Sequence, residues 1–146
     1  IVASLDFSFA SENAKFAQTE VKVGIIPGIG GTQNLARCVG LKRAKELILT
    51  GRIFTAQEAL EYGLINGVYK KEELMKNVIE YAKLISSNAP IAVRQAKKSI
   101  EIGYNLSLSD GMSFEIECYN KTINTKDRVE GINAFNENRK PNFKGN

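Results

Sequence analysis

Residues 16–40 read FAQTEVKVGIIPGIGGTQNLARCVG and carry the strongest local pattern in the chain. The segment VKVGII, residues 21–26, is rich in β-branched residues and predicts a short strand. Three glycines follow a proline, and the apolar residues after them recur at helical spacing. The stretch therefore predicts a strand, a glycine turn and a helix in succession, with Gly28, Gly30 and Gly31 in the turn.

The sequence on both sides predicts an α/β part followed by helices. The segment DFSFA, residues 6–10, alternates polar and apolar residues as a half-buried strand does. Thr55 and Glu58 have capping-box spacing for a helix that ends near Gly63, and a short strand is expected at 64–69. Further helices are expected at 44–49, 72–85, 91–102, 108–123 and 128–136, and the final segment PNFKGN is expected to be frayed.

Composition limits the classes of function. The 146 residues are 43% hydrophobic and 25% charged, which suits a globular chain with one core, and no apolar run approaches the roughly 20 residues of a membrane span. Basic and acidic residues are interspersed, so a net charge of +4 favours a small polyanionic ligand over nucleic acid. Two well-separated cysteines favour a reducing compartment, either the cytoplasm or, in a eukaryote, the mitochondrial matrix.

The absence of histidine narrows the chemistry further. Neither a Ser-His-Asp triad nor an imidazole metal site can be built from this chain, and no metal is expected. Any acid or base must come from Asp, Glu, Lys, Tyr or Cys. Taken alone, Glu20 is typical of a solvated surface residue and the glycine turn is typical of a packed corner. Gln33 also occupies the third glycine position of a dinucleotide fingerprint.

The combined pattern resembles the crotonase family. Residues 16–40 resemble its segment of Phe, Glu, Ile-Pro-Gly and Gly-Gly-Thr-Gln at these separations. The likeness continues through LILTGRIFTAQEALEYGLIN, NAPIAVRQAKKSI and EGINAFNENRKPNF, and so covers essentially the whole chain. This resemblance implies part of a crotonase-like ββα spiral at residues 1–69. It also implies an all-helical region at 70–146 that assembles homotrimers, often paired into hexamers.

The resemblance also implies a chemistry. Family hydratases add water to a trans-2-enoyl-CoA with two glutamates, while two backbone N–H groups bind the thioester oxygen. The second glutamate corresponds to Glu20, the water-holding amide to Gly28, and Pro27 belongs to the substrate site. Phe135 matches a family residue that contacts coenzyme A, but Asn138 replaces the nearby lysine, so Arg139 or Lys140 is expected to supply that charge. Coenzyme A enters only as part of the substrate, and no other cofactor is implied.

The first family glutamate would immediately precede Ile1, and both oxyanion amides would lie upstream of it. We therefore expect this chain to be the C-terminal half of an enzyme and to be inactive alone. Two alternatives remain open. One is an enoyl-CoA isomerase of the same family; the other is a non-catalytic binding or assembly module, with RNA as a partner suggested by the pI near 9.1.

Overall fold

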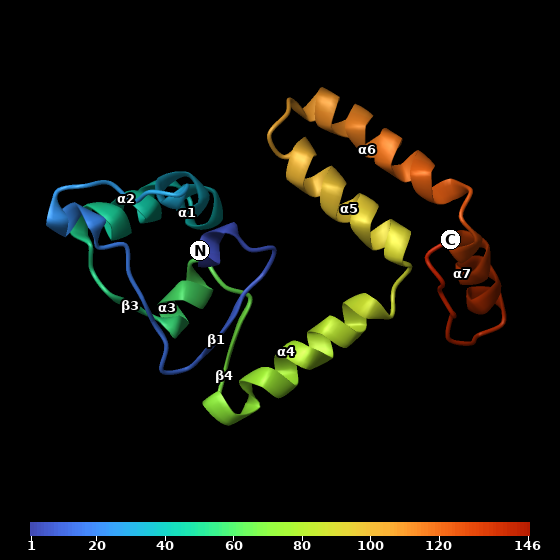
Figure 1. The fold of residues 1–146 in the computed structure, drawn as a ribbon, viewed down its shortest axis with the longest axis horizontal. Coiled ribbons are helices and arrows are strands. Elements are labelled where there is room, and N and C mark those ends of the chain that lie inside the picture. Colours follow the sequence, from blue (N-terminus) through green and yellow to red (C-terminus); the bar gives the residue numbers. More distant parts are fainter. The chain divides into compact units, whose positions relative to one another are not determined.

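The computed structural model describes all residues, 1–146, and they form two compact units, Ile1–Ile79 and Glu80–Asn146 (Figure 1). The boundary between the two units lies within helix α4, Lys71–Ser86. The division expected from the sequence lies at 69/70, where the last strand ends and the helices begin. No helix in either unit has the length and apolar character required to cross a bilayer.

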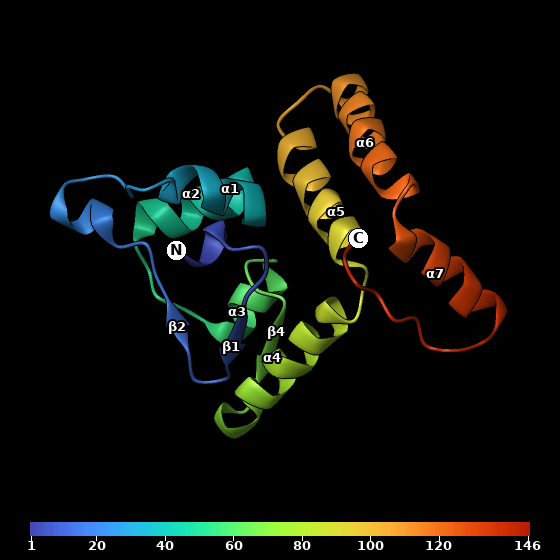
Figure 2. The same ribbon diagram turned by 45° about the vertical axis from the view of Figure 1, so that its right-hand side comes forward.

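The first unit is a small α/β structure with two separate ladders. Strands β1, Phe9–Ser11, and β4, Gly67–Tyr69, pair in parallel (Figure 2). Strands β2, Lys15–Phe16, and β3, Phe54–Thr55, pair antiparallel. Its helices are the 3-10 helices Val2–Ser4 and Glu20–Val23, the α-helices α1, Gly31–Val39, α2, Leu41–Thr50, and α3, Ala56–Glu61, and the part of α4 up to Ile79.

The core of this unit lies between α1, α2 and α3. Leu35 from α1 and Leu47 from α2 are its largest fully buried side chains, and both come from the apolar faces of amphipathic helices. Phe54 on β3 is also buried and stacks on Phe16 of β2, with ring centroids 5.7 Å apart. Burial of these side chains is the main favourable contribution to the stability of the unit.

The capping box predicted for α3 is present. The Thr55 hydroxyl accepts a hydrogen bond from the Glu58 backbone N–H at 3.2 Å, and the Glu58 carboxylate accepts one from the Thr55 N–H at 2.8 Å. Two donors that the first helical turn leaves unpaired are thereby satisfied. The helices α1 and α2 are distinct because the chain changes direction at Gly40, whose φ is 77°.

The strand predicted at residues 21–26 is wrong. Glu20–Val23 instead forms a 3-10 helix, and Gly24, with φ 82°, ends it in the left-handed region. The side chains of Val23, Ile25 and Ile26 are 75, 61 and 73% exposed, and no strand pairs with this segment. Strand preference of β-branched residues reflects packing on a neighbouring strand, and that neighbour is absent here.

The second unit is helical, as predicted. It contains the end of α4 and helices α5, Pro90–Gly103, α6, Leu108–Ile123, and α7, Lys126–Asn136. Helices α5 and α6 lie side by side as an antiparallel hairpin (Figures 1 and 2). Glycines permit a close approach at the turn end of this hairpin, because a Cβ on Gly111 would lie 3.2 Å from the Gly103 carbonyl oxygen.

The frayed C-terminus predicted for PNFKGN is also wrong. Asp127, at the start of α7, is only 2% exposed, and its carboxylate accepts hydrogen bonds from the N–H groups of Lys144 and Gly145 at 2.7 and 2.8 Å. The carbonyl oxygen of Asn146 accepts from Lys126 N–H at 2.8 Å. The tail thus satisfies a buried carboxylate and free N–H groups of the α7 N-terminus, which holds the last residues in place.

Candidate active site

Glu20 and Gly28 line the same cavity in the first unit. The cavity has a volume of about 480 Å³ and extends between the first four residues, the end of β2, the Glu20–Val23 helix and the glycine turn before α1. Glu20 is partly buried and supplies the only carboxylate of the cavity wall, where Lys15, Gln18 and Asn34 are the other large polar side chains. The geometry therefore brings the two residues proposed for chemistry to a common space.

A neighbouring glutamine holds the Glu20 carboxylate. With the nitrogen of its terminal amide facing Glu20, Gln18 donates to both Oε1 and Oε2, each over 3.1 Å. The opposite amide orientation would place acceptor against acceptor, because an ionised carboxylate only accepts. Sequence reasoning gave Gln18 no role, although its position two residues before Glu20 in the quoted motif was the signal available.

The glycine turn presents backbone groups to the cavity. Gly28 O accepts from Gly31 N–H at 2.9 Å, which closes the turn, whereas the Gly28 N–H donates to no protein acceptor. A Cβ built on Gly28 would meet no atom within 4 Å, so the fold itself does not require a glycine there. The space beside Gly28 is available to a ligand, and its N–H is available to bind one.

Pro27 does not line the cavity. Its side chain is buried beneath the turn, and a Cβ on Gly31 would lie only 2.7 Å from Pro27 Cβ. The contact fixes the corner between the turn and helix α1. Pro27 therefore packs against the turn without lining the cavity, and its predicted place in the substrate site stays a prediction.

The other predicted binding residues belong to the second unit. Phe135 is 83% exposed at the end of α7. Arg139 forms a two-pronged ion pair with Glu130, with Nη2 2.9 Å from Oε2, and also pairs with Glu137. The Arg139 hydrogen bond lowers the pKa of Glu130 to about 2. Lys140 is exposed and forms no ion pair, so its charge rather than that of Arg139 is left for a ligand.

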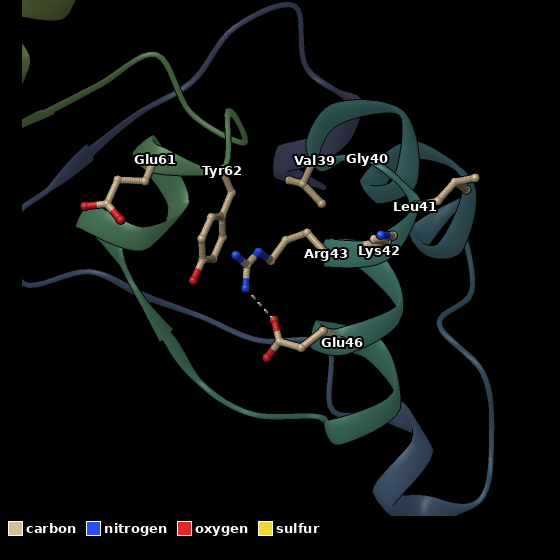
Figure 3. A pocket seen from close by; sticks show the side chains of 8 residues that line it. All are labelled: Val39, Gly40, Leu41, Lys42, Arg43, Glu46, Glu61 and Tyr62. Atoms are coloured by element: carbon tan, nitrogen blue, oxygen red, sulfur yellow. Dashed lines mark hydrogen bonds and ion pairs between the residues drawn. The ribbon is translucent and has the colours of Figure 1, made fainter.

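A second, larger cavity of about 850 Å³ lies between the start of α2 and the end of α3 (Figure 3). The Arg43 guanidinium reaches between the Tyr62 ring, 4.0 Å from its centroid, and Glu46, 3.1 Å away. Arg52 joins Glu46 to Glu58, and Tyr62 donates to Glu58 at 3.1 Å. These charges neutralise one another, and the network contains none of the residues predicted for the site.

The arrangement around Glu20 permits proton transfer and water binding. A carboxyl group held by an amide can take up a proton when ionised and deliver one when protonated, and a nearby free N–H can hold a water molecule or a substrate oxygen. No group of three or more His, Cys, Asp or Glu side chains is placed to bind a metal ion.

Comparison with solved structures defines the fold class. The chain superposes with a TM-score of 0.97 on an enoyl-CoA hydratase from Bacillus anthracis, with 49% sequence identity over 99% of this chain and 56% of that one. The predicted crotonase-type fold is thereby confirmed. The sequence profile of the enoyl-CoA hydratase/isomerase family matches residues 1–146, and the chain belongs to this family.

Curated relatives agree with this assignment. The chain is 44% identical over 140 residues to a short-chain-enoyl-CoA hydratase from Clostridium acetobutylicum, covering 96% of this chain and 54% of the relative. A short-chain-enoyl-CoA hydratase from Clostridioides difficile is 42% identical over 135 residues, with 92 and 87% covered. The chain thus spans about half the length of the Clostridium acetobutylicum relative and of the Bacillus anthracis structure.

Proposed function

We propose that the full-length protein containing this chain adds water reversibly to trans-2-enoyl-CoA thioesters. The observation that carries the proposal is the shared cavity of Glu20 and Gly28, in which Gln18 holds the carboxylate and the Gly28 N–H has no protein partner. Membership of the enoyl-CoA hydratase/isomerase family and the names of the relatives support the same reaction.

In this mechanism Glu20 acts as one of two acid–base groups, and the Gly28 N–H helps to hold the water that is added. Two carboxylates in one enclosed site cannot both ionise cheaply, so one keeps a proton and acts as the acid. The second carboxylate would come from outside residues 1–146, because Glu20 is the only carboxylate on this cavity wall. We accordingly expect residues 1–146 alone to be inactive.

Replacing Glu20 tests the proposal. In the full-length protein, Glu20→Gln should lower kcat for crotonyl-CoA hydration by about 100- to 10,000-fold, because an amide cannot act as a general acid or base near neutral pH. The matched control is Glu61→Gln, which changes an exposed carboxylate of α3 that does not line the Glu20 cavity. This variant should keep the rate within about twofold of the wild type. Equal rates for the Glu20→Gln and Glu61→Gln variants would show that Glu20 takes no part in the reaction.

Double-bond isomerisation is the second candidate, because the family includes isomerases by name. Retention of a glutamate at position 20, positioned by Gln18, favours hydration. Incubating the full-length protein with a 3-enoyl-CoA distinguishes the two reactions. Formation of the conjugated 2-enoyl thioester faster than crotonyl-CoA is hydrated would favour the isomerase.

We further propose that the second unit binds coenzyme A and mediates self-association. Phe135 and Lys140 offer an exposed ring and an unpaired cation for the nucleotide part of the thioester. Large apolar side chains on α5, α6 and α7 are exposed, which supports assembly as a homotrimer or hexamer. They include Ile100, Leu108, Ile116 and Val129. Coenzyme A serves only as part of the substrate, and the two free cysteines fit a reducing compartment such as cytoplasm or mitochondrial matrix.

A further inference from the structure

Ile29 adopts a backbone conformation that its side chain disfavours. Its φ is 51°, in the left-handed region, where a β-branched residue is a genuine outlier. Glycine would take the same conformation without strain, and the chain uses glycine at the next position, Gly30, where φ is 73°. The isoleucine side chain is therefore present at a cost in folding free energy.

The chain's own packing does not compensate for this cost. The exposed area of Ile29 is 104% of the reference value for isoleucine, so the side chain gains almost no burial from residues 1–146. A strained backbone conformation together with an unburied apolar side chain is characteristic of residues that act on something outside the fold. The contact partner of Ile29 must then be a ligand or another polypeptide segment.

The position of Ile29 favours a ligand. Ile29 lines the same cavity as Glu20 and directly follows Gly28 in the chain. Glu20 and Gly28 are the two residues proposed to handle protons and water. A ligand that reacts between these residues has its reacting carbons beside Gly28, and the adjacent side chain meets whatever extends from those carbons. Since an isoleucine side chain cannot hydrogen-bond, the matching part of the ligand is apolar.

We propose that Ile29 is a specificity-determining residue that contacts the acyl chain of the CoA thioester. This inference rests on the proposed function, because the thioester is the ligand that the function supplies. Ile29 contributes contact area that only longer acyl chains reach. Shortening the side chain to alanine removes three carbons from that contact, and each lost methylene contact weakens binding of a long chain measurably.

Binding of saturated thioesters tests the inference without turnover. Calorimetric Kd values for butyryl-CoA, decanoyl-CoA and free coenzyme A are compared in the full-length protein and in its Ile29→Ala variant. We expect Ile29→Ala to weaken decanoyl-CoA binding by about tenfold and to change butyryl-CoA and free coenzyme A by less than about twofold. The matched control is Ile26→Ala, whose side chain is 73% exposed in the same segment but outside the cavity; its three Kd values should remain at wild-type level.

The outcomes separate this inference from the proposed function. A loss of affinity that grows with acyl-chain length and occurs only in Ile29→Ala supports the inference, even if the protein fails to hydrate crotonyl-CoA. Failure to hydrate crotonyl-CoA would contradict the proposed function and leave the inference standing. Equal losses for all three ligands, no loss, or tighter decanoyl-CoA binding would overturn it. Unchanged affinities with altered oligomeric state in Ile29→Ala would also overturn it, by assigning the side chain to a polypeptide contact.

Discussion

Gln18 donates from one side-chain amide to both carboxylate oxygens of Glu20, at 3.1 Å each. The two residues are separated by Thr19 alone, at the point where the chain enters the Glu20–Val23 helix. No other side chain hydrogen-bonds to the Glu20 carboxylate. The orientation of Glu20 within the cavity therefore depends on Gln18.

Gln18→Met should impair turnover more than binding. Methionine has similar length but no amide donor, so the variant keeps the volume and loses the hydrogen bonds to the carboxylate. A hydrogen bond to a charged group contributes about 1.5–3 kcal/mol, and we expect kcat for crotonyl-CoA to fall by roughly 10- to 100-fold with KM changed less than about threefold. Gln57→Met, on exposed Gln57 of α3, provides the control. A rise in KM at constant kcat would instead show that Gln18 contributes to substrate binding.

Two glycines of the turn should respond differently to the same substitution. A Cβ on Gly31 would lie 2.7 Å from the rigid Pro27 ring, so Gly31→Ala should lower the free energy of unfolding by about 1–3 kcal/mol. A Cβ on Gly28 meets no atom, and Gly28→Ala should change stability by less than about 0.5 kcal/mol while lowering kcat/KM, because the methyl group enters ligand space. Urea unfolding and hydration kinetics of the full-length protein measure both. Comparable stability losses in the two variants would contradict the geometry.

The meeting of Glu20 and Gly28 at one cavity was expected from the motif in residues 16–40, and the structure brings the two together. The resemblance of this motif to the crotonase family implied the proximity, because the family's second glutamate and its water-holding amide serve one site. Their catalytic roles stay a prediction. The helices were predictable for a related reason, since capping residues such as Thr55 act locally and leave a pattern in the sequence.

The features that sequence reasoning missed depend on contacts between segments. Residues 21–26 have the local preference of a strand, but the partner strand that would stabilise one is absent. The C-terminal tail is held by Asp127, and nothing in PNFKGN itself indicates that carboxylate. The positive φ of Ile29 runs against the intrinsic preference of isoleucine, so no propensity rule could have predicted it.

Ser8→Ala should stabilise the first unit. The Ser8 hydroxyl oxygen is buried without a hydrogen-bond partner, although its backbone N–H and carbonyl pair with Asn66 at 2.9 and 2.7 Å. Removing an unsatisfied buried hydroxyl removes its desolvation cost, and we expect the free energy of unfolding to rise by up to about 1 kcal/mol. In Ser11→Ala, by contrast, a 2.7 Å hydrogen bond to Asn13 is lost, and stability should fall slightly. Urea unfolding compares the two, and a loss of stability in Ser8→Ala would indicate an unseen partner for the hydroxyl.

Acid should destabilise the protein partly through Glu58. The Thr55 backbone N–H, followed by Arg52, lowers the pKa of Glu58 from 4.5 to about 2. A carboxyl group with a lowered folded-state pKa contributes stability that is fully present above its unfolded-state pKa and is lost as the pH falls towards the folded-state value. The contribution of Glu58 should therefore disappear between about pH 4.5 and 2.

Glu58→Gln should be less stable at neutral pH and should lose less stability over that interval than the wild type, as measured by urea unfolding at a series of pH values. Glu12→Gln, an exposed position without this network, should run parallel to the wild-type curve. A Glu58→Gln curve that is also parallel would show that the Thr55 and Arg52 contacts do not favour the ionised carboxylate in the folded state.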